Sequence, residues 1–257
     1  MAEPGSSLNS VVNLGMGCLG SAPGPVDRAD IQSLVDWYSS SGIEPCIELC
    51  PYAHPSVARA CAELGFILNP RTERSGAPRG FDTVLYRTLR RDEHITPAQP
   101  ASLSFDICEI DPADSARVRE FATVCATSDD PASGPPPAFA IDSVERCIRQ
   151  PRTLALAAML SDRIIGVGMV EIAPPHRGDA IAALFSAKVA PACRRRGVQQ
   201  ALLAARLNSA ISRGATIATI TSRPGIATER NVRRLGFQTA CTKVILIRPG
   251  PGLAPAQ

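Results

Sequence analysis

The sequence lacks the features that mark membrane, secreted and metal-binding proteins. No apolar run approaches the roughly 20 residues that a membrane helix needs. The first residues carry no basic segment like the one that opens a secretory signal. The nine cysteines include no C-x-x-C pair, so neither a zinc site nor a disulfide framework is indicated. We therefore expect a cytoplasmic protein with reduced thiols, without a membrane partner and without a metal.

Strong charge is missing as well. The formal net charge is only +3, whereas a nucleic-acid partner usually leaves a concentrated basic patch or stripe, so we expect no nucleic acid. The one dense basic cluster, Arg194 to Arg196, needs a local explanation. The three histidines are too scattered for metal ligation, and no G-x-S-x-G elbow is present. Hydrophobic residues make up 45% of the chain and charged ones 20%, which is ordinary for a globular protein with a sizeable core.

A chain of 257 residues is long enough for two domains. The stretch 91–103 is polar, bears prolines and shows neither strand nor helix periodicity, so it is the expected linker. It separates a first domain at 1–90 from a second at 104–249. The tail 250–257 is expected to be disordered, because its prolines cannot donate to a β-ladder and it has nothing to form a core.

Strands and helices alternate in the second domain. The expected order is a strand at 105–110, a helix from 112 to about 127, a short helix at 142–150, a hairpin of 153–160 with 163–172, a strand at 180–189, a helix at 198–213, a strand at 215–221, a helix at 227–235 and a final strand at 242–247. This order predicts an α/β (α+β) fold with a mixed sheet.

The first domain repeats part of this order. A helix, Gly42, a strand-like run, a second helix and Leu64-Gly65-Phe66 are followed by another strand. The second domain has a helix, Gly214, a strand, a helix and Leu235-Gly236-Phe237, with nearly the same spacing between the two glycines. The simplest interpretation is a partial internal duplication.

The arginine cluster lies between an expected strand and an expected helix. The first N–H groups of a helix have no intrahelical partner, and the helix dipole adds partial positive charge there. Arginine side chains add forked, charge-assisted contacts that suit phosphate oxygens. Gly197 allows close approach of the backbone where a Cβ would intrude. The segment therefore predicts a phosphate-binding loop, although a solvated basic surface is the alternative.

At this loop the sequence resembles the GNAT superfamily of acyl-CoA-dependent N-acyltransferases. The resemblance covers 104–249 and is carried by Val189-Ala-Pro-Ala-Cys-Arg194-Arg-Arg-Gly197-Val-Gln199-Gln-Ala-Leu-Leu203, followed by Asn231-Val-Arg-Arg-Leu235-Gly236-Phe237. Gln199 departs from the family pattern, which has Gly or Ala there. The resemblance implies a GNAT-like mixed, mostly antiparallel sheet flanked by helices, preceded by a smaller related α/β domain that is a degenerate GNAT-like partial repeat.

The resemblance also implies a reaction. It indicates acetyl-CoA as co-substrate and a primary amine of a small molecule or peptide as acceptor. A homodimer is a separate expectation that the sequence leaves open. The residues it assigns to the CoA pyrophosphate and pantetheine arm are Lys188, Val189, Arg194, Arg195, Arg196, Gly197, Val198, Gln199, Gln200 and Asn231. Asn231 has an alternative role in solvating its helix.

The catalytic groups are less evident. The family often places a proton-donating tyrosine four residues before the Gly-Phe glycine, where this chain has Val232. Glu171 and Asp179 are the candidate bases, and each has the alternative of being a solvated carboxylate at a strand end. Two functions remain open: an active N-acetyltransferase, or a CoA-binding regulatory or scaffold protein with lapsed catalysis.

Overall fold

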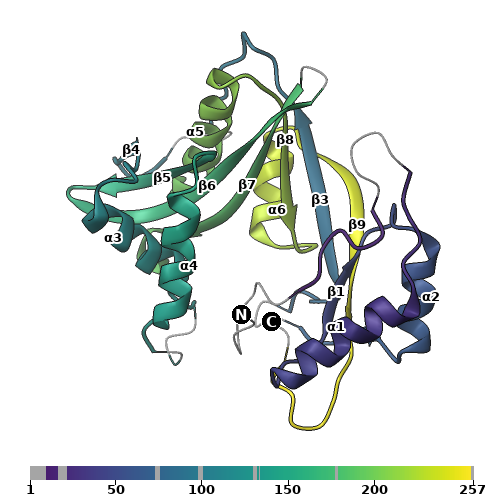
Figure 1. The fold of residues 1–257 in the computed structure, drawn as a ribbon. Coiled ribbons are helices and arrows are strands. Elements are labelled where there is room, and N and C mark those ends of the chain that lie inside the picture. Colours follow the sequence, from purple (N-terminus) through teal and green to yellow (C-terminus); the bar gives the residue numbers. More distant parts are fainter. Residues whose placement is uncertain are drawn as a thin grey trace. The chain divides into compact units, whose positions relative to one another are not determined.

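The computed structural model describes residues 10–16, 22–72, 76–97, 101–129, 132, 134–176 and 179–255, and Figure 1 shows its ribbon. The chain forms two compact units. The first contains Met1–Val84, Ser222–Glu229 and Thr239–Gln257. The second contains Leu85–Thr221 and Arg230–Gln238. The segments of the two units therefore alternate along the chain. The boundaries expected from the sequence, 1–90 and 104–249, would instead make the units consecutive.

The expected linker 91–103 belongs to the second unit. Ile95 is buried, its N–H donates to Asn208 Oδ1 at 2.8 Å, and its carbonyl accepts from Asn208 Nδ2 at 2.9 Å. Leu103 packs against the same core. Two apolar side chains of this polar stretch thus pack on a core that local periodicity could not reveal, and the linker boundaries 91–103 stay a prediction.

The expected disorder of the tail 250–257 stays a prediction, although the structure describes residues 250–255 and gives them backbone hydrogen bonds. The N–H of Ala254 donates to the carbonyl of Gly42 at 2.7 Å, and its carbonyl accepts from the N–H of Glu44 at 2.9 Å. These bonds form a parallel bridge between Ala254 and Ile43. Ala254 thus supplies the backbone N–H donor that a proline lacks, together with a carbonyl acceptor.

The first unit packs two helices near a small antiparallel sheet. Helix α1 (Arg28–Ser40) begins with a capping box made by Asp27 and Asp30. Helix α2 (Pro55–Glu63) has proline in its first turn, and the His54 ring accepts from the Ser56 N–H. Strands β1 (Cys46–Leu49) and β2 (Ile67–Leu68) both pair antiparallel with β9 (Gln238–Ile247), which has β3 (Phe81–Thr88) on its other side. The core residues are Ile31, Val35, Ile47, Val57, Ala60, Cys61, Leu64 and Phe66.

The second unit contains the larger part of the sheet. Its strand order is β3-β8-β7-β6-β5-β4. The bounds of its remaining elements are β4 (Asp106–Glu109), α3 (Ser115–Ala126), α4 (Ala138–Ile148), β5 (Thr153–Leu160), β6 (Arg163–His176), β7 (Asp179–Val189), a short 3₁₀ turn η2 (Pro191–Cys193), α5 (Val198–Ser212), β8 (Ala215–Ser222) and α6 (Ala227–Arg234). The strands from β4 to β7 pair antiparallel and β7 pairs parallel with β8. The predicted mixed, mostly antiparallel sheet flanked by helices is confirmed.

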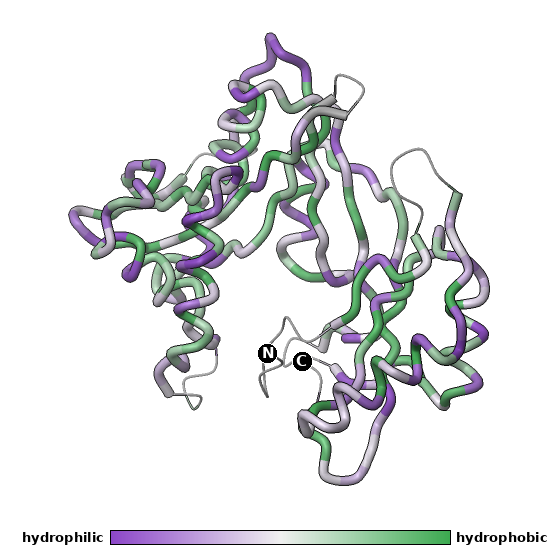
Figure 2. Tube along the Cα trace, in the orientation of Figure 1, coloured by the Kyte–Doolittle hydropathy of each residue, from purple (hydrophilic) through white to green (hydrophobic). Residues whose placement is uncertain are grey.

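Helices cover both faces of this sheet. On β5, Leu156 and Ala158 pack with α5, whereas the alternate residues Ala155 and Ala157 pack with α3 and α4. This alternation follows from the period of two along a strand. Figure 2 shows hydrophobic residues concentrated along the strands and mixed with hydrophilic ones in α3 and α4. Helix α5 therefore lies on the face opposite α3 and α4.

The turns of the proposed repeat have the same backbone form in both halves. Gly42 and Gly214, which follow a helix, have φ of 68° and 84°. Gly65 and Gly236, which precede phenylalanine, have φ of 76° and 84°. A left-handed glycine after the last helical residue is a common helix ending. A common origin of the two halves stays a prediction.

Candidate functional site

Strand β7 loses its neighbour β8 part-way along its length. The two strands run in parallel and pair as far as Leu184, which lies opposite Ile220. β7 continues to Val189 and stays paired with β6 on its other side. Within the described residues, the segment 185–189 has no strand partner on the β8 side. That edge offers backbone groups to a ligand that runs alongside it.

A β-bulge lies where β7 leaves β8. On β6 the single residue Gly168 stands opposite two residues of β7, Ser186 and Ala187. Ser186 has a left-handed φ of 48°, which is unusual for a residue with a side chain. The extra residue of a bulge stays outside the ladder and bends its strand. A backbone N–H held in this way can donate to an oxyanion that forms beside it.

The arginine loop, residues 194–197, joins β7 to α5. Arg195 and Gly197 both have left-handed backbones, with φ of 59° and 86°. Backbone N–H groups around such residues form concavities that bind anions, and the dipole of α5 favours negative charge at the same place. Gly197 is the N-cap and has no side chain to accept from the first-turn N–H groups. In the described part of the chain, the exposed side chains of Arg195 and Arg196 form no ion pair.

Lys188 and Arg194 are both tied to Asp129. Arg194 Nη2 lies 2.6 Å from Asp129 Oδ1, and Arg194 Nε donates to the carbonyl of Val189 at 3.1 Å. Lys188 Nζ lies 3.1 Å from the same Oδ1 and donates to the carbonyl of Thr127. Partial burial raises the pKa of Asp129, but the hydrogen bonds and charges of Lys188 and Arg194 outweigh it and lower that pKa. The Arg194 side chain therefore braces the end of β7.

Gly197 is in contact with the segment that was expected to be a linker. A Cβ at Gly197 would lie 2.7 Å from the Cα of Ala101, which is closer than side chains tolerate. The N–H of Ser102 donates to the carbonyl of Arg196 at 3.2 Å. The absence of a side chain at Gly197 therefore lets the backbone of Ala101 lie close to the loop.

The first turn of α5 is held by Asn231 of α6. Asn231 Nδ2 donates to Gln199 Oε1 at 2.6 Å, and its Oδ1 accepts from Gln200 Nε2 at 3.1 Å. Arg234 Nη1 also donates to that oxygen at 3.0 Å. Gln200 is buried, and so is Val198, the first residue of the helix. The structure thus brings together Gln199, Gln200 and Asn231, and the asparagine fixes the two glutamine side chains.

Arg206 is a buried residue of α5 that the sequence analysis did not single out. Its exposed fraction is 0%, and burial lowers the pKa of its guanidinium to about 10. Nη1 donates to the carbonyls of Met169 at 3.2 Å and Phe185 at 3.4 Å, which belong to β6 and β7 next to the bulge. The sequence signal that could have identified Arg206 is its spacing, since it lies four residues after Leu202 on the apolar stripe of the helix.

Of the two candidate bases, the structure describes the side chain of Glu171 alone. Glu171 is exposed on β6 and lies opposite Ala183, on the part of β7 that β8 still covers. It is three residues along the strand from Ser186, or about 10 Å at ~3.3 Å per residue. The side chain of Asp179 lies outside the described residues. Val232, where the resemblance leads one to look for a tyrosine, has an exposed fraction of 0% and belongs to the core.

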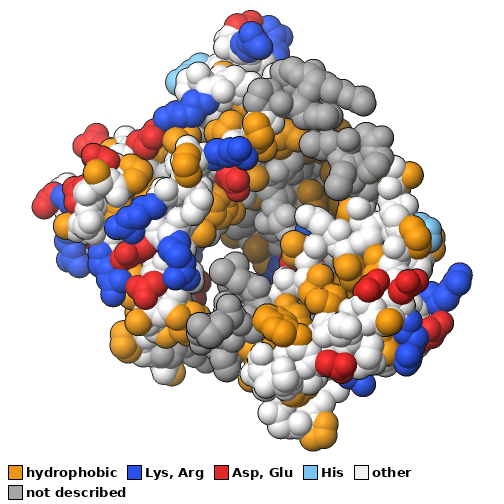
Figure 3. Space-filling view, viewed as in Figure 1, with side chains coloured by type: hydrophobic (Ala, Val, Ile, Leu, Met, Phe, Trp, Pro, Cys, Tyr) orange, Lys and Arg blue, Asp and Glu red, His pale blue; other side chains and the backbone are white. Residues whose placement is uncertain are grey.

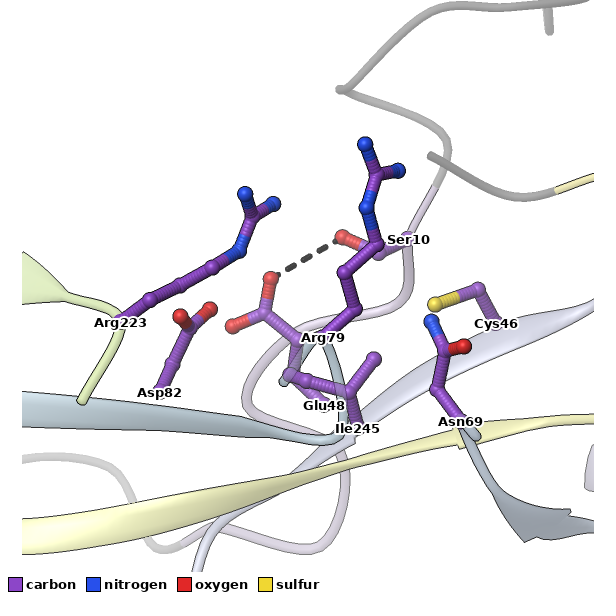
Figure 4. A pocket seen from close by; sticks show the side chains of 8 residues that line it. All are labelled: Ser10, Cys46, Glu48, Asn69, Arg79, Asp82, Arg223 and Ile245. Carbon is purple, nitrogen blue, oxygen red and sulfur yellow. Dashed lines mark hydrogen bonds between the residues drawn. The ribbon is translucent and has the colours of Figure 1, made fainter. Parts of the chain in front are cut away.

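The first unit contains a separate polar cavity of about 90 Å³. Its lining residues, shown in Figure 4, are Ser10, Cys46, Glu48, Asn69, Arg79, Asp82, Arg223 and Ile245. Glu48 accepts from Ser10 Oγ at 3.1 Å and from Lys243 Nζ at 3.1 Å. Burial and then the charge of Glu48 raise the pKa of Asp82 to about 6. None of the residues that the sequence assigned to a site lines this cavity.

Charges of both signs mix on the helical face of the second unit. Figure 3 shows acidic and basic side chains side by side over α3 and α4, where Arg119 pairs with Asp142 and Glu145 at 3.0 Å each. In the described ranges no group of three or more His, Cys, Asp or Glu side chains is placed to hold a metal ion. No described helix is long and apolar enough to cross a membrane.

Comparison with known proteins gives a match in structure alone. No protein-family model matches the chain, and no curated protein matches it in sequence. A GCN5-related N-acetyltransferase from Kribbella flavida matches with a TM-score of 0.60 and 18% identity, over 98% of this chain and 86% of that one. A second, from Sphaerobacter thermophilus, matches with a TM-score of 0.58 and 17% identity, over 88% and 69%. The chain has the GCN5-related N-acetyltransferase (GNAT) fold.

A third match is described as a tandem GNAT protein. A tandem GNAT protein from the clavulanic acid biosynthesis pathway matches with a TM-score of 0.55 and 16% identity, over 81% of this chain and 65% of that chain. At these identities the comparisons establish the fold, and what the site does must be argued from its geometry.

Proposed function

We propose that the chain is an N-acyltransferase that moves an acetyl group from acetyl-CoA to a primary amine of a small molecule or peptide. The observation that carries the proposal is the sequence of features along β7. The strand leaves β8 after Leu184, bulges at Ser186 and continues through the short turn η2 to the arginine loop at the N-terminus of α5. One strand thus combines an anion-binding end, an edge without a strand partner and a bulge with a left-handed residue.

The loop fits a pyrophosphate in its donor set. Two left-handed residues and a helix N-terminus without a side-chain cap provide backbone N–H groups. Arg195 and Arg196 are exposed and can add charge-assisted contacts, whereas Arg194 is engaged by Asp129. The edge of β7 at 185–189 suits an amide-bearing chain such as pantetheine, because its backbone groups can bind amides as a further strand would.

The chemistry requires few side chains. The neutral amine nitrogen attacks the thioester carbon, the carbonyl oxygen becomes an oxyanion, and the C–S bond then breaks to release CoA thiolate while the amine loses a proton. A backbone N–H of the bulge is the proposed donor to the oxyanion. A thiol with an ordinary pKa of about 8.5 is a good leaving group near neutral pH, so an acid at position 232 is not required. Glu171 and Asp179 stay proposals for the base that takes the amine proton.

A CoA-binding regulatory or scaffold protein without turnover is the second candidate. Val232 favours it, since a fully buried valine occupies the place where the family often has its acid. The first unit is proposed in either case to be a degenerate GNAT-like half, and a homodimer is a proposal of the same standing. The two functions differ in one measurement, which is turnover.

The first experiment measures release of free thiol from acetyl-CoA across a panel of primary amines. We expect turnover with at least one amine. Binding of acetyl-CoA by calorimetry without turnover on every amine would select the second candidate.

The second experiment tests the loop. Arg196→Glu is expected to weaken CoA binding roughly tenfold or more, because a hydrogen bond to a charged group contributes about 1.5–3 kcal/mol. Arg146→Glu is the matched control, since it makes the same charge change on an exposed residue of α4, which packs on the other face of the sheet. Equal affinities of the two variants would contradict the assignment of the loop.

A further inference from the structure

Arg206 places a charged group inside the hydrophobic interior of the second unit. Besides its bonds to Met169 and Phe185, its Nε donates to the carbonyl of Leu202 at 3.2 Å. In the described structure, Nη2 is buried without a hydrogen-bond partner. A buried cation with an unsatisfied donor is destabilising relative to an aliphatic side chain of similar size. Stability alone therefore does not explain an arginine at this position.

The backbone of β6 is shaped to receive this side chain. A Cβ at Gly168 would lie 2.9 Å from both Cζ and Nε of Arg206. Two residues earlier on the same face, a Cβ at Gly166 would lie 2.9 Å from Val198 Cγ1 and 3.1 Å from Leu202 Cδ1. The two glycines thus face successive turns of α5, and one of them receives the guanidinium.

The guanidinium lies at the bulge itself. Gly168 is the β6 residue that stands opposite the two residues of the bulge. Phe185, whose carbonyl accepts from Nη1, immediately precedes Ser186, the residue with the left-handed backbone. Nη1 therefore bridges the two strands between the bulge and Leu184, the last residue of β7 that pairs with β8. Such a bridge fixes the direction in which the following peptide groups of β7 point.

We propose that Arg206 is a positioning residue for acyl transfer, whose guanidinium holds the Met169 and Phe185 carbonyls together so that the bulge amide faces the thioester carbonyl. The inference rests on the proposed function. It assigns to Arg206 no contact with the substrate, because the residue is enclosed by α5, β6 and β7. Nη2 has no hydrogen-bond partner in the described structure because the guanidinium is oriented so that Nη1 reaches two carbonyls on different strands.

Gly168→Ala tests the proposal without removing the arginine. The added methyl group displaces the guanidinium from its carbonyls, because the side chain is fully buried and held by hydrogen bonds to Met169 and Phe185. Gly166→Ala is the matched control, since it adds the same group on the same strand face at the same closest distance but against aliphatic atoms. Arg206→Met removes the donors, and Arg206→Lys keeps the charge with one donor group.

We expect kcat to fall at least tenfold in Gly168→Ala, with the Kd for acetyl-CoA within threefold of the parent protein. Gly166→Ala should lower the melting temperature by a similar amount and keep kcat within threefold. Arg206→Lys should lie between the parent and Arg206→Met in kcat. Loss of kcat in Gly168→Ala that is no larger than in Gly166→Ala would overturn the proposal, because both would then report only packing.

A structural readout separates this inference from the proposed function. Amide hydrogen exchange at Ser186 and Ala187, measured by NMR, should be faster in Gly168→Ala than in Gly166→Ala. If the parent protein binds acetyl-CoA but turns over no amine, the proposed function fails and the exchange difference alone supports or overturns the role of Arg206 at the bulge. Unchanged exchange in Gly168→Ala overturns it in either case.

Discussion

Gly197 and Gly214 lie at the two ends of α5. Replacing each by alanine measures how much the contact between Ala101 and the arginine loop contributes to stability. Their φ values, 86° and 84°, are nearly equal, so alanine meets the same left-handed strain of about 1–2 kcal/mol at both. Their surroundings differ. A Cβ at Gly197 would lie 2.7 Å from the Cα of Ala101, while in the described structure nothing lies within 4 Å of a Cβ at Gly214.

We expect Gly197→Ala to destabilise the protein more than Gly214→Ala does. Moving the Ala101 segment breaks the hydrogen bond from Ser102 to the carbonyl of Arg196, which contributes about 1 kcal/mol. With lost packing, the difference between the variants should be about 1–2 kcal/mol. That corresponds to a melting temperature lower by several degrees, at roughly 2–4 °C per kcal/mol for domains of this size.

The assay is thermal unfolding of both variants, with CoA affinity measured by calorimetry on the same samples. Gly214→Ala should keep the parent's affinity, because it changes only the far end of the helix. Equal melting temperatures would refute the reasoning, since the contact with Ala101 would then contribute nothing in solution.

Two further predictions concern charged groups. The pKa of Asp82, about 6, lies above its unfolded value. The contribution of this carboxyl to the free energy of unfolding is therefore largest below about pH 4 and is lost as the pH rises to about 6. Asp82→Asn should remove this slope from denaturation curves, and an unchanged slope would exclude Asp82 as its source. Asp129→Asn frees Lys188 and Arg194. The substitution should lower the free energy of unfolding by at most about 1 kcal/mol, because the three charged groups are partly exposed. CoA affinity should rise at low salt and the gain shrink as salt is added; a loss of affinity would show that bracing Arg194 matters more than its charge.

Local patterns predicted the elements that position the site. The helix expected at 198–213 is α5 at Val198–Ser212, and the hairpin of 153–160 with 163–172 is β5 with β6, which extends further to His176. These predictions depend on periodicity and turn residues that lie within one segment. The strand–loop–helix order around the arginine loop is likewise local, which is why the loop was found.

Contacts between distant segments were not predictable in this way. β9 pairs with β1 across almost 200 positions of sequence, so the last strand of one expected domain lies in the unit of the other. Ala101 contacts Gly197, and the guanidinium of Arg206 lies where a Cβ at Gly168 of β6 would intrude. A lone arginine on an apolar helix stripe is equally compatible with a snorkelling side chain at a surface. Its burial follows from tertiary packing that the sequence pattern does not encode.

Position 232 provides the last prediction. Val232 is fully buried among the core residues of the second unit, so its side chain points into packed apolar atoms. Val232→Tyr would insert a ring and a hydroxyl there, and overpacking of this kind costs typically about 1–3 kcal/mol. We therefore expect the variant to melt several degrees lower without any gain in kcat, measured by thiol release at saturating acetyl-CoA. Val232→Phe is the matched control, because it adds the ring without the hydroxyl. A kcat higher in Val232→Tyr than in Val232→Phe would contradict this argument, since the hydroxyl would then reach the leaving thiolate. Equal kcat values in the two variants would mean that this chain releases the thiolate without an acid from this helix position.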